Sequence, residues 1–320
     1  MHRERTVESI NRIFQNEEYG FEAFVVMKND VLKRLILFEG SPGNRRTNKH
    51  ENFKEAIRAD ISEYIIKEYL SPEAEYELAE KIADNQHKYY VIEQTDAYRP
   101  FNMLNTPIDS LDTFSMDDRP EAKGLLFMFK RDDTKVWGYQ HIYAVTVPNK
   151  SKKGWLSIQD GDVFKEMPLS LFPIAKKVHL LIIEHEIVTK DISLMQRSFR
   201  FETFIRNSAQ TVIEKVSNID LVDNLEKLSL YAERSQLTYA KKMMRIKNSA
   251  VLRLSAELLL ERIQTLPRWS GKFILSNDKI VLNTFGQVEN LIDLLDEKYT
   301  RSDVTGEEYS TDVKQLAPPI

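Results

Sequence analysis

Cysteine is absent from this 320-residue chain, and glycine occurs only 10 times. The absence of cysteine excludes disulfide bonds, thiol catalysis and cysteine metal ligands, and it fits a reducing compartment. No window approaches the roughly 18–20 uncharged apolar residues of a membrane-spanning helix. The charged start, MHRERTVESINRIF, lacks the apolar core of a signal peptide. The sequence therefore predicts a cytoplasmic protein that reaches a membrane only through a partner.

Signatures of catalysis are also missing. The chain has no nucleophile elbow, Walker motif or zinc-binding helix motif. The loop Gly40–Asn44, beside Arg45 and Arg46, lacks the spacing of a phosphate-binding loop. Glu121-Ala122-Lys123 is the one sequence that suits a metal-dependent nuclease, and no upstream partner acid accompanies it. No catalytic residue, metal site or cofactor is predicted, and the question of enzymatic activity stays open.

The first 190 residues are rich in strand-forming patterns. Phe21–Lys28 and Val31–Phe38 flank Asn29-Asp30, which is typical of a tight hairpin. Further strands are expected at Tyr89–Glu93, Leu125–Lys130, Val136–Val147, Trp155–Gln159 and Val163–Glu166. We therefore predict a β-rich, mixed-sheet α/β region over residues 1–190.

Two helices are predicted within this region. The first begins near Asn48 and ends near Leu70, because Ser71-Pro72 disfavours its continuation. Pro72 suits the first turn of the second helix, which is expected to continue to about Asn85.

The apolar run Val178–Thr189 predicts one deeply buried strand. Alternation along such a strand places His179 and His185 on one face and Glu184 and Glu186 on the other. A metal or acid–base site would need partners from other segments, and none can be identified. A strand end that reaches solvent is the favoured interpretation.

The sequence pattern changes after Asp191, and we predict a mainly helical region over residues 191–320. The clearest element is an amphipathic helix at Phe201–Val216. Lys272–Leu275 and Lys279–Leu282 suit a small hairpin, and a helix capped by Thr284 follows. The predicted fold class is thus α+β, and the helices with their hairpin are loosely similar to a winged-helix module.

The stretch Arg234–Ile263 is distinguished by its charge. No acidic residue occurs from Arg234 to Ala256, although the whole chain has 49 Asp and Glu against 45 Lys and Arg. The basic residues in this interval are Arg234, Lys241, Lys242, Arg245, Lys247 and Arg253. A local positive surface attracts polyanions, of which nucleic acid is the commonest large one. The alternative is a solvated helix face that lacks acids by chance.

Helical spacing indicates how this basic surface is carried. Leu237, Ala240 and Met244 recur with a helical period, which predicts that they face the core. Lys241, Lys242 and Arg245 then share one exposed turn beside that apolar stripe. Ser249 is expected to cap a second helix, whose apolar stripe is Leu252, Ala256, Leu259, Ile263 and Leu266.

Two further groups of basic residues are candidates for the same interaction. Lys150, Lys152 and Lys153 lie in an interval without acids that runs from Asp133 to Asp160. Arg197 and Arg200 directly precede the helix at Phe201–Val216.

The C-terminal half resembles the KwaB-like family, named for the second component of the Kiwa antiphage defence system. The similar segments are RSFRFETFIRNSA (Arg197–Ala209), KKMMRIKNSAVL (Lys241–Leu252) and LIDLLDEKYTRSDVTGEEY (Leu291–Tyr309). The resemblance is best over about residues 195–310, and none of these segments is a catalytic signature. It implies a cytoplasmic DNA-binding effector that self-associates and docks on a small transmembrane partner, KwaA.

Three functions remain open at this point. The first is a non-enzymatic DNA-binding defence effector without strong sequence preference, which blocks phage DNA replication or expression. The second is a metal-dependent nuclease, and the third is a scaffold whose basic helices bind an acidic protein. Composition alone indicates only an α/β protein with a basic surface, and the resemblance favours the first function.

Overall fold

A computed structural model describes residues 2–16, 18–37, 53–81, 88–143, 157–160, 163–166, 174–301 and 308–310. The chain divides into two compact units, which we call the sheet unit and the helical unit. The sheet unit comprises Met1–Tyr76, His87–Thr95 and Arg99–Asp191. The helical unit comprises Glu77–Gln86, Asp96–Tyr98 and Ile192–Ile320.

One sheet of eight strands, in the order β2-β1-β5-β6-β9-β10-β4-β3, organises the sheet unit. From β2 to β4, neighbouring strands pair antiparallel. The strands are β1 (Gly20–Met27), β2 (Leu32–Leu35), β3 (Tyr76–Leu78), β4 (Tyr89–Glu93), β5 (Ala122–Arg131), β6 (Thr134–His141), β9 (Leu180–Ile183) and β10 (Glu186–Thr189). A separate pair joins β7 (Ser157–Asp160) to β8 (Val163–Glu166). The predicted hairpin around Asn29-Asp30 is confirmed, and Asp30 takes the positive φ that its turn requires.

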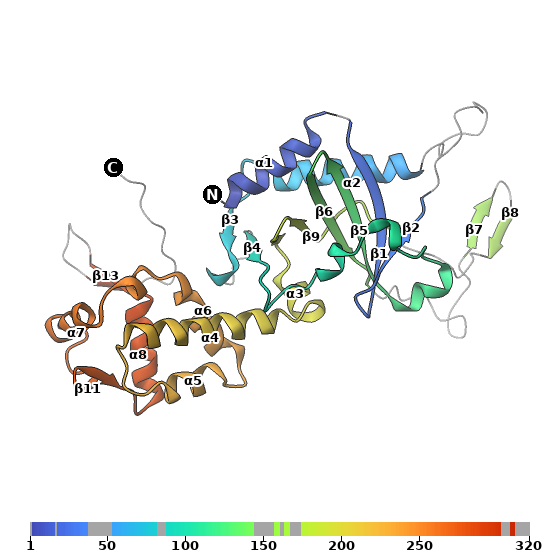
Figure 1. The fold of residues 1–320 in the computed structure, drawn as a ribbon. Helices are drawn as coiled ribbons and strands as arrows, with labels where there is room; N and C mark the ends of the chain where they lie inside the picture. Colours follow the sequence, from blue (N-terminus) through green and yellow to red (C-terminus); the bar gives the residue numbers. More distant parts are fainter. Residues whose placement is uncertain are drawn as a thin grey trace. The chain divides into compact units, whose positions relative to one another are not determined.

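Helices α1 (His2–Phe14) and α2 (Phe53–Tyr69) pack on one face of the sheet (Figure 1). Ile10 of α1 and Ile61 of α2 are buried there against strand residues such as Phe127. Residue alternation places Phe24 and Trp137 on the opposite face, which is buried as well. Because both faces are buried, the central strands carry nearly continuous apolar runs.

Gly124 of β5 allows a close approach inside this sheet. Its cross-strand partner is His141, and the ring of Tyr139 covers it. A Cβ at position 124 would collide with the outer ring atoms of Tyr139. The Tyr139 hydroxyl also donates to the Lys123 carbonyl at 3.2 Å, so the ring is held in place.

Two sequence predictions in the sheet unit are wrong. The second helix, expected from Pro72 to about Asn85, is replaced by β3 and a 3₁₀ turn at Ala79–Lys81. Tyr76 stacks on Tyr89 of β4 at 5.3 Å, so packing between segments overrides the local helical pattern. The single strand expected at Val178–Thr189 is instead the hairpin β9–β10, which turns at Glu184 with a φ of 52°.

The helical unit is built around α4 (Phe201–Ile219), which lies beside α6 in Figure 1. Every apolar residue predicted for its inner face is buried, and Glu202 pairs with Arg206 at 3.0 Å as expected. The other helices are α3 (Ile192–Ser198), α5 (Glu226–Ala232), α6 (Leu237–Arg245), α7 (Ala256–Thr265) and α8 (Phe285–Leu295). The short strand pairs are β11 (Ile274–Ser276) with β12 (Lys279–Val281) and β13 (Tyr299–Arg301) with β14 (Glu308–Ser310).

The fold class of a β-rich first half and a mainly helical second half with a small hairpin is confirmed. The predicted capping box between Thr284 and Gln287 is present at the start of α8. Ser249, however, caps only the 3₁₀ turn Ala250–Arg253, and Ser255 caps α7. None of the helices in the described part of the chain has the length and apolarity needed to cross a membrane.

Candidate nucleic-acid interface

Residues 192–301, which form most of the helical unit, carry a positive excess that the whole chain lacks. Residues 192–301 contain 17 Lys and Arg against 13 Asp and Glu, a net charge of +4, whereas the 320-residue chain has a net charge of −4. Helix α6 is amphipathic and packs on α4, and its residues Ala240, Met243 and Met244 are buried. Its basic residues Lys241, Lys242 and Arg245 lie off this buried stripe and are partly exposed.

Arg234 is held by stacking. Its guanidinium carbon lies 3.9 Å from the ring centre of Tyr239 and 4.9 Å from that of Phe285. Arg234 makes no ion pair with any residue that the structure describes. A stacked guanidinium keeps its in-plane N–H groups available for hydrogen bonds to an anion. This geometry leaves Arg234 able to bind an anion, and its two aromatic partners were not predicted from the sequence.

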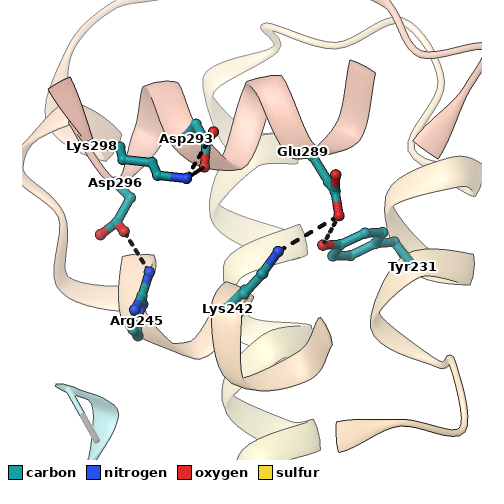
Figure 2. Close-up of polar contacts among 7 residues, drawn as sticks. All are labelled: Tyr231, Lys242, Arg245, Glu289, Asp293, Asp296 and Lys298. Atoms are coloured by element: carbon teal, nitrogen blue, oxygen red, sulfur yellow. Dashed lines mark hydrogen bonds and ion pairs between the residues drawn. The ribbon is translucent and has the colours of Figure 1, made fainter. Parts of the chain in front are cut away.

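Lys242 instead faces a carboxylate of α8. Its Nζ lies 3.6 Å from Oε1 of Glu289, and Figure 2 shows the same oxygen accepting a hydrogen bond from the Tyr231 hydroxyl at 3.2 Å. The side chains of Lys242 and Glu289 are 44% and 48% exposed, so the ion pair is solvated. Burial and the neighbouring Glu289 raise the pKa of Tyr231, which keeps the hydroxyl protonated as the donor.

Arg245 is more deeply engaged. Its Nη2 donates to Oδ2 of Asp296 at 3.0 Å, and both side chains are about three-quarters covered. Lys298, which follows the end of α8, pairs with Asp293 of that helix at 3.4 Å (Figure 2). Lys241, Lys242 and Arg245 were predicted to share one exposed turn. All three are only partly exposed, and α8 and its C-cap residue supply carboxylates to Lys242 and Arg245.

Lys247 is a structural residue in this fold. Its Nζ binds Oε1 of Glu80 at 3.0 Å, and its backbone carbonyl accepts a hydrogen bond from Lys215 at 2.7 Å. Glu80 is almost fully buried, so its carboxylate depends on the ammonium of Lys247. Lys247 thus contributes little to an external surface.

The remaining predicted cations divide into two groups. Lys241 is partly exposed, and Arg253, Arg197 and Arg200 are exposed. These four make no ion pair within the described part of the chain. Lys150, Lys152 and Lys153 lie outside the described residues, as do Arg45 and Arg46. Arg234, Lys241 and Arg253 are therefore the uncompensated part of the predicted basic stretch.

The Glu121-Ala122-Lys123 sequence lies at the start of β5. Lys123 binds Asp30 at 2.8 Å, and Glu121 faces Lys28 at 3.7 Å, so both residues join β5 to the turn of the β1–β2 hairpin. Within the described ranges, no group of three His, Asp or Glu side chains has the geometry of a metal site.

His179 and His185 do not share a strand, because β9 begins after one and the β9–β10 turn contains the other. His179 Nδ1 accepts a hydrogen bond from the backbone N–H of His141 at 3.0 Å. Burial lowers the pKa of His179, and the charge of Lys177 lowers it further, although Asp191 opposes the shift. The folded sheet unit therefore favours the neutral ring.

The surroundings of His179 predict that the folding stability of the sheet unit decreases in acid. The unfolded chain binds a proton at His179 more readily than the folded chain, so His179 favours folding above the ordinary pKa of about 6.5. We expect that contribution to fall as the pH drops through the lowered folded pKa. His179→Asn, which keeps an acceptor near the Nδ1 position, should flatten the dependence of urea-unfolding stability on pH between about 7.5 and 5. Equal pH dependence in both proteins would contradict the assignment.

Comparison with known proteins identifies one relationship. A family model described as Kiwa protein KwaB-like matches residues 119–305, which is more than half of the chain. The match extends from β5 to β13 and thus includes the α4, α6 and α8 helices described above. No curated protein and no solved structure matches the sequence.

Proposed function

The chain belongs to the KwaB-like family and is thus a component of Kiwa antiphage defence, and from this premise we propose that it binds DNA without strong sequence preference. In this proposal it docks on a transmembrane partner of the KwaA type and blocks replication or expression of phage DNA. The protein then acts in the cytoplasm, at the membrane surface, through its partner.

The positive excess over residues 192–301 is the observation that carries DNA binding. The net charge of +4 over these residues contrasts with the acidic remainder of the chain, and Arg234, Lys241 and Arg253 make no ion pair with described carboxylates. Phosphate contacts give affinity without reading sequence, and their strength falls with salt because bound counterions are released. Arg197 and Arg200 are proposed as further contacts on the same unit.

Charge reversal tests the surface directly. In the variant Arg234→Glu/Lys241→Glu/Arg253→Glu, we expect DNA affinity to fall by about tenfold or more. The slope of log affinity against log salt should become shallower by about 0.9 for each lost phosphate contact. Fluorescence anisotropy with a labelled duplex over a salt series measures both quantities.

A matched control places charge reversal on the sheet unit. Lys135→Glu/Lys177→Glu changes exposed lysines that make no described ion pair, and it should leave the salt slope unchanged. Equal losses in the two variants would mean that only net charge matters. A helical-unit variant that binds like the parent would place the DNA site elsewhere, with Lys150, Lys152 and Lys153 as the next residues to test.

The same binding assay separates the alternative functions. Cleavage of the duplex after addition of a divalent metal would favour a nuclease, and absence of DNA binding with retention of an acidic protein would favour a scaffold.

We also propose that the protein self-associates. Light scattering at micromolar concentration, alone and with a co-expressed membrane partner, measures assembly, and a strictly monomeric mass in both cases would contradict it.

A further inference from the structure

Basic residues of α6 pair with acidic residues of α8 and its C-cap along a line that we call the seam. The order of the pairs along the seam follows the order of the residues in both segments. Tyr231, Lys242 and Glu289 occupy its middle, and Arg245 meets Asp296 further along (Figure 2). At the other end, α8 presents Phe285 to Arg234 instead of a carboxylate. The seam therefore contains one uncompensated cation, one loosely paired cation and one firmly paired cation.

The Lys242–Glu289 ion pair is weaker than the neighbouring Arg245–Asp296 pair, so Lys242 can exchange Glu289 for another anion more easily. Its single contact is 3.6 Å long and half exposed, whereas the Arg245–Asp296 contact is 3.0 Å long and largely covered. A solvated lysine pair of this kind is held weakly. The Tyr231 hydroxyl fixes Glu289, so Lys242 can leave while the carboxylate stays in place. The flexible lysine stem allows the ammonium to turn to another anion without movement of either helix.

We propose that Glu289 is a selectivity residue of the DNA-binding surface, whose carboxylate competes with ligand phosphates for Lys242. This inference rests on the proposed DNA binding. A ligand gains the Lys242 contact only if its local phosphate density outweighs one fixed carboxylate. Duplex DNA carries one charge per roughly 1.7 Å of axis, about twice the linear density of a single strand. Glu289 therefore makes the surface favour duplex DNA over single strands and other weaker polyanions.

The test replaces the carboxylate with an amide of the same shape. Glu289→Gln keeps an oxygen that accepts from Tyr231 and removes the charge that holds Lys242. We expect duplex affinity to rise only about twofold to threefold with little change in its salt slope, because the duplex already displaces Glu289 from Lys242 in the parent. Affinity for a single strand of the same length should rise more, so the ratio of duplex to single-strand affinity should fall.

Asp220→Asn is the matched control. Asp220 pairs with Lys279 at 2.6 Å in the same unit, its side chain is mostly exposed, and asparagine tolerates its positive φ of 59°. It removes the same single charge without releasing Lys242. The control should change affinity by less than about twofold and leave the duplex preference intact. Melting temperatures of both variants should match that of the parent.

A double-mutant cycle assigns the gain to Lys242. In the parent, Lys242→Ala should lower duplex affinity and hardly change single-strand affinity, because only the duplex displaces Glu289 from Lys242. In the Glu289→Gln background it should abolish the single-strand gain. Equal gains in Glu289→Gln and Asp220→Asn, or an unchanged duplex preference, would overturn the role of Glu289 while DNA binding itself stands. A parent protein and variants that all fail to bind DNA would overturn the proposed function and this inference together.

Discussion

Met244→Asp should unfold the helical unit or destabilise it by about 3–5 kcal/mol. Met244 is 1% exposed on α6, and its neighbour Met243 is completely buried. A carboxylate at position 244 would lose its hydration, and burial of an unpaired charge is strongly destabilising. Urea unfolding followed by far-ultraviolet circular dichroism should show a lower midpoint or loss of helical signal before denaturant is added.

Met244→Leu provides the control for this prediction. It keeps an apolar side chain of similar volume, so its cost should be below about 1.5 kcal/mol. A Met244→Asp protein with the stability of the Met244→Leu protein would mean that position 244 faces solvent. The position of Lys241 and Lys242 relative to the core would then be wrong as well.

Gly124→Ala should cost the sheet unit about 2–3 kcal/mol, although it adds a single methyl group. The new Cβ would overlap the outer ring atoms of Tyr139, which is fully buried and hydrogen-bonded to the Lys123 carbonyl. Neither the ring nor the paired strands can move without loss of packing. Thermal unfolding of the variant should give a lower melting temperature than the parent.

Two variants distinguish the clash from a general effect of alanine. Gly20→Ala, on β1, meets only the Lys130 carbonyl at 3.6 Å and should be neutral or slightly stabilising. Gly124→Ala/Tyr139→Leu removes the ring atoms involved, so its cost should be smaller than the sum of the single changes. Additive costs in the double variant would show that Gly124 and Tyr139 do not interact.

The elements that were predicted correctly are those in which apolar residues recur with a clear helical or strand period. The buried face of α4 was predicted because one long amphipathic helix has only one way to turn its apolar side inward. The β9–β10 hairpin was missed because a run buried on both faces has no alternation that distinguishes one strand from two. The helix α1 was also missed, because its charged sequence gives only a few core residues, such as Ile10 and Ile13.

Local sequence patterns were also insufficient to predict the ion pairs of the candidate site. The sequence indicated which residues are basic, but Glu289 lies 47 positions after Lys242 in the chain, and Asp296 lies 51 positions after Arg245. No local pattern encodes such partners. Glu289 and Asp296 could have been noticed as acids on the polar face of the last predicted helix. Their effect on the α6 cations follows only from the packing of α6 and α8 in one unit.

The buried Glu80–Lys247 pair determines which fragments of the chain can be expressed as folded proteins. Glu80 belongs to the helical unit although it precedes most of the sheet strands in the chain, and Tyr98 likewise joins that unit, donating to the Phe199 carbonyl at 3.0 Å. Expression of residues 192–320 alone would leave Lys247 without its carboxylate and uncover the rings beside Tyr98. A division at residue 190 into two independently folding domains remains a prediction, and a soluble C-terminal fragment should need residues 77–98 supplied as well.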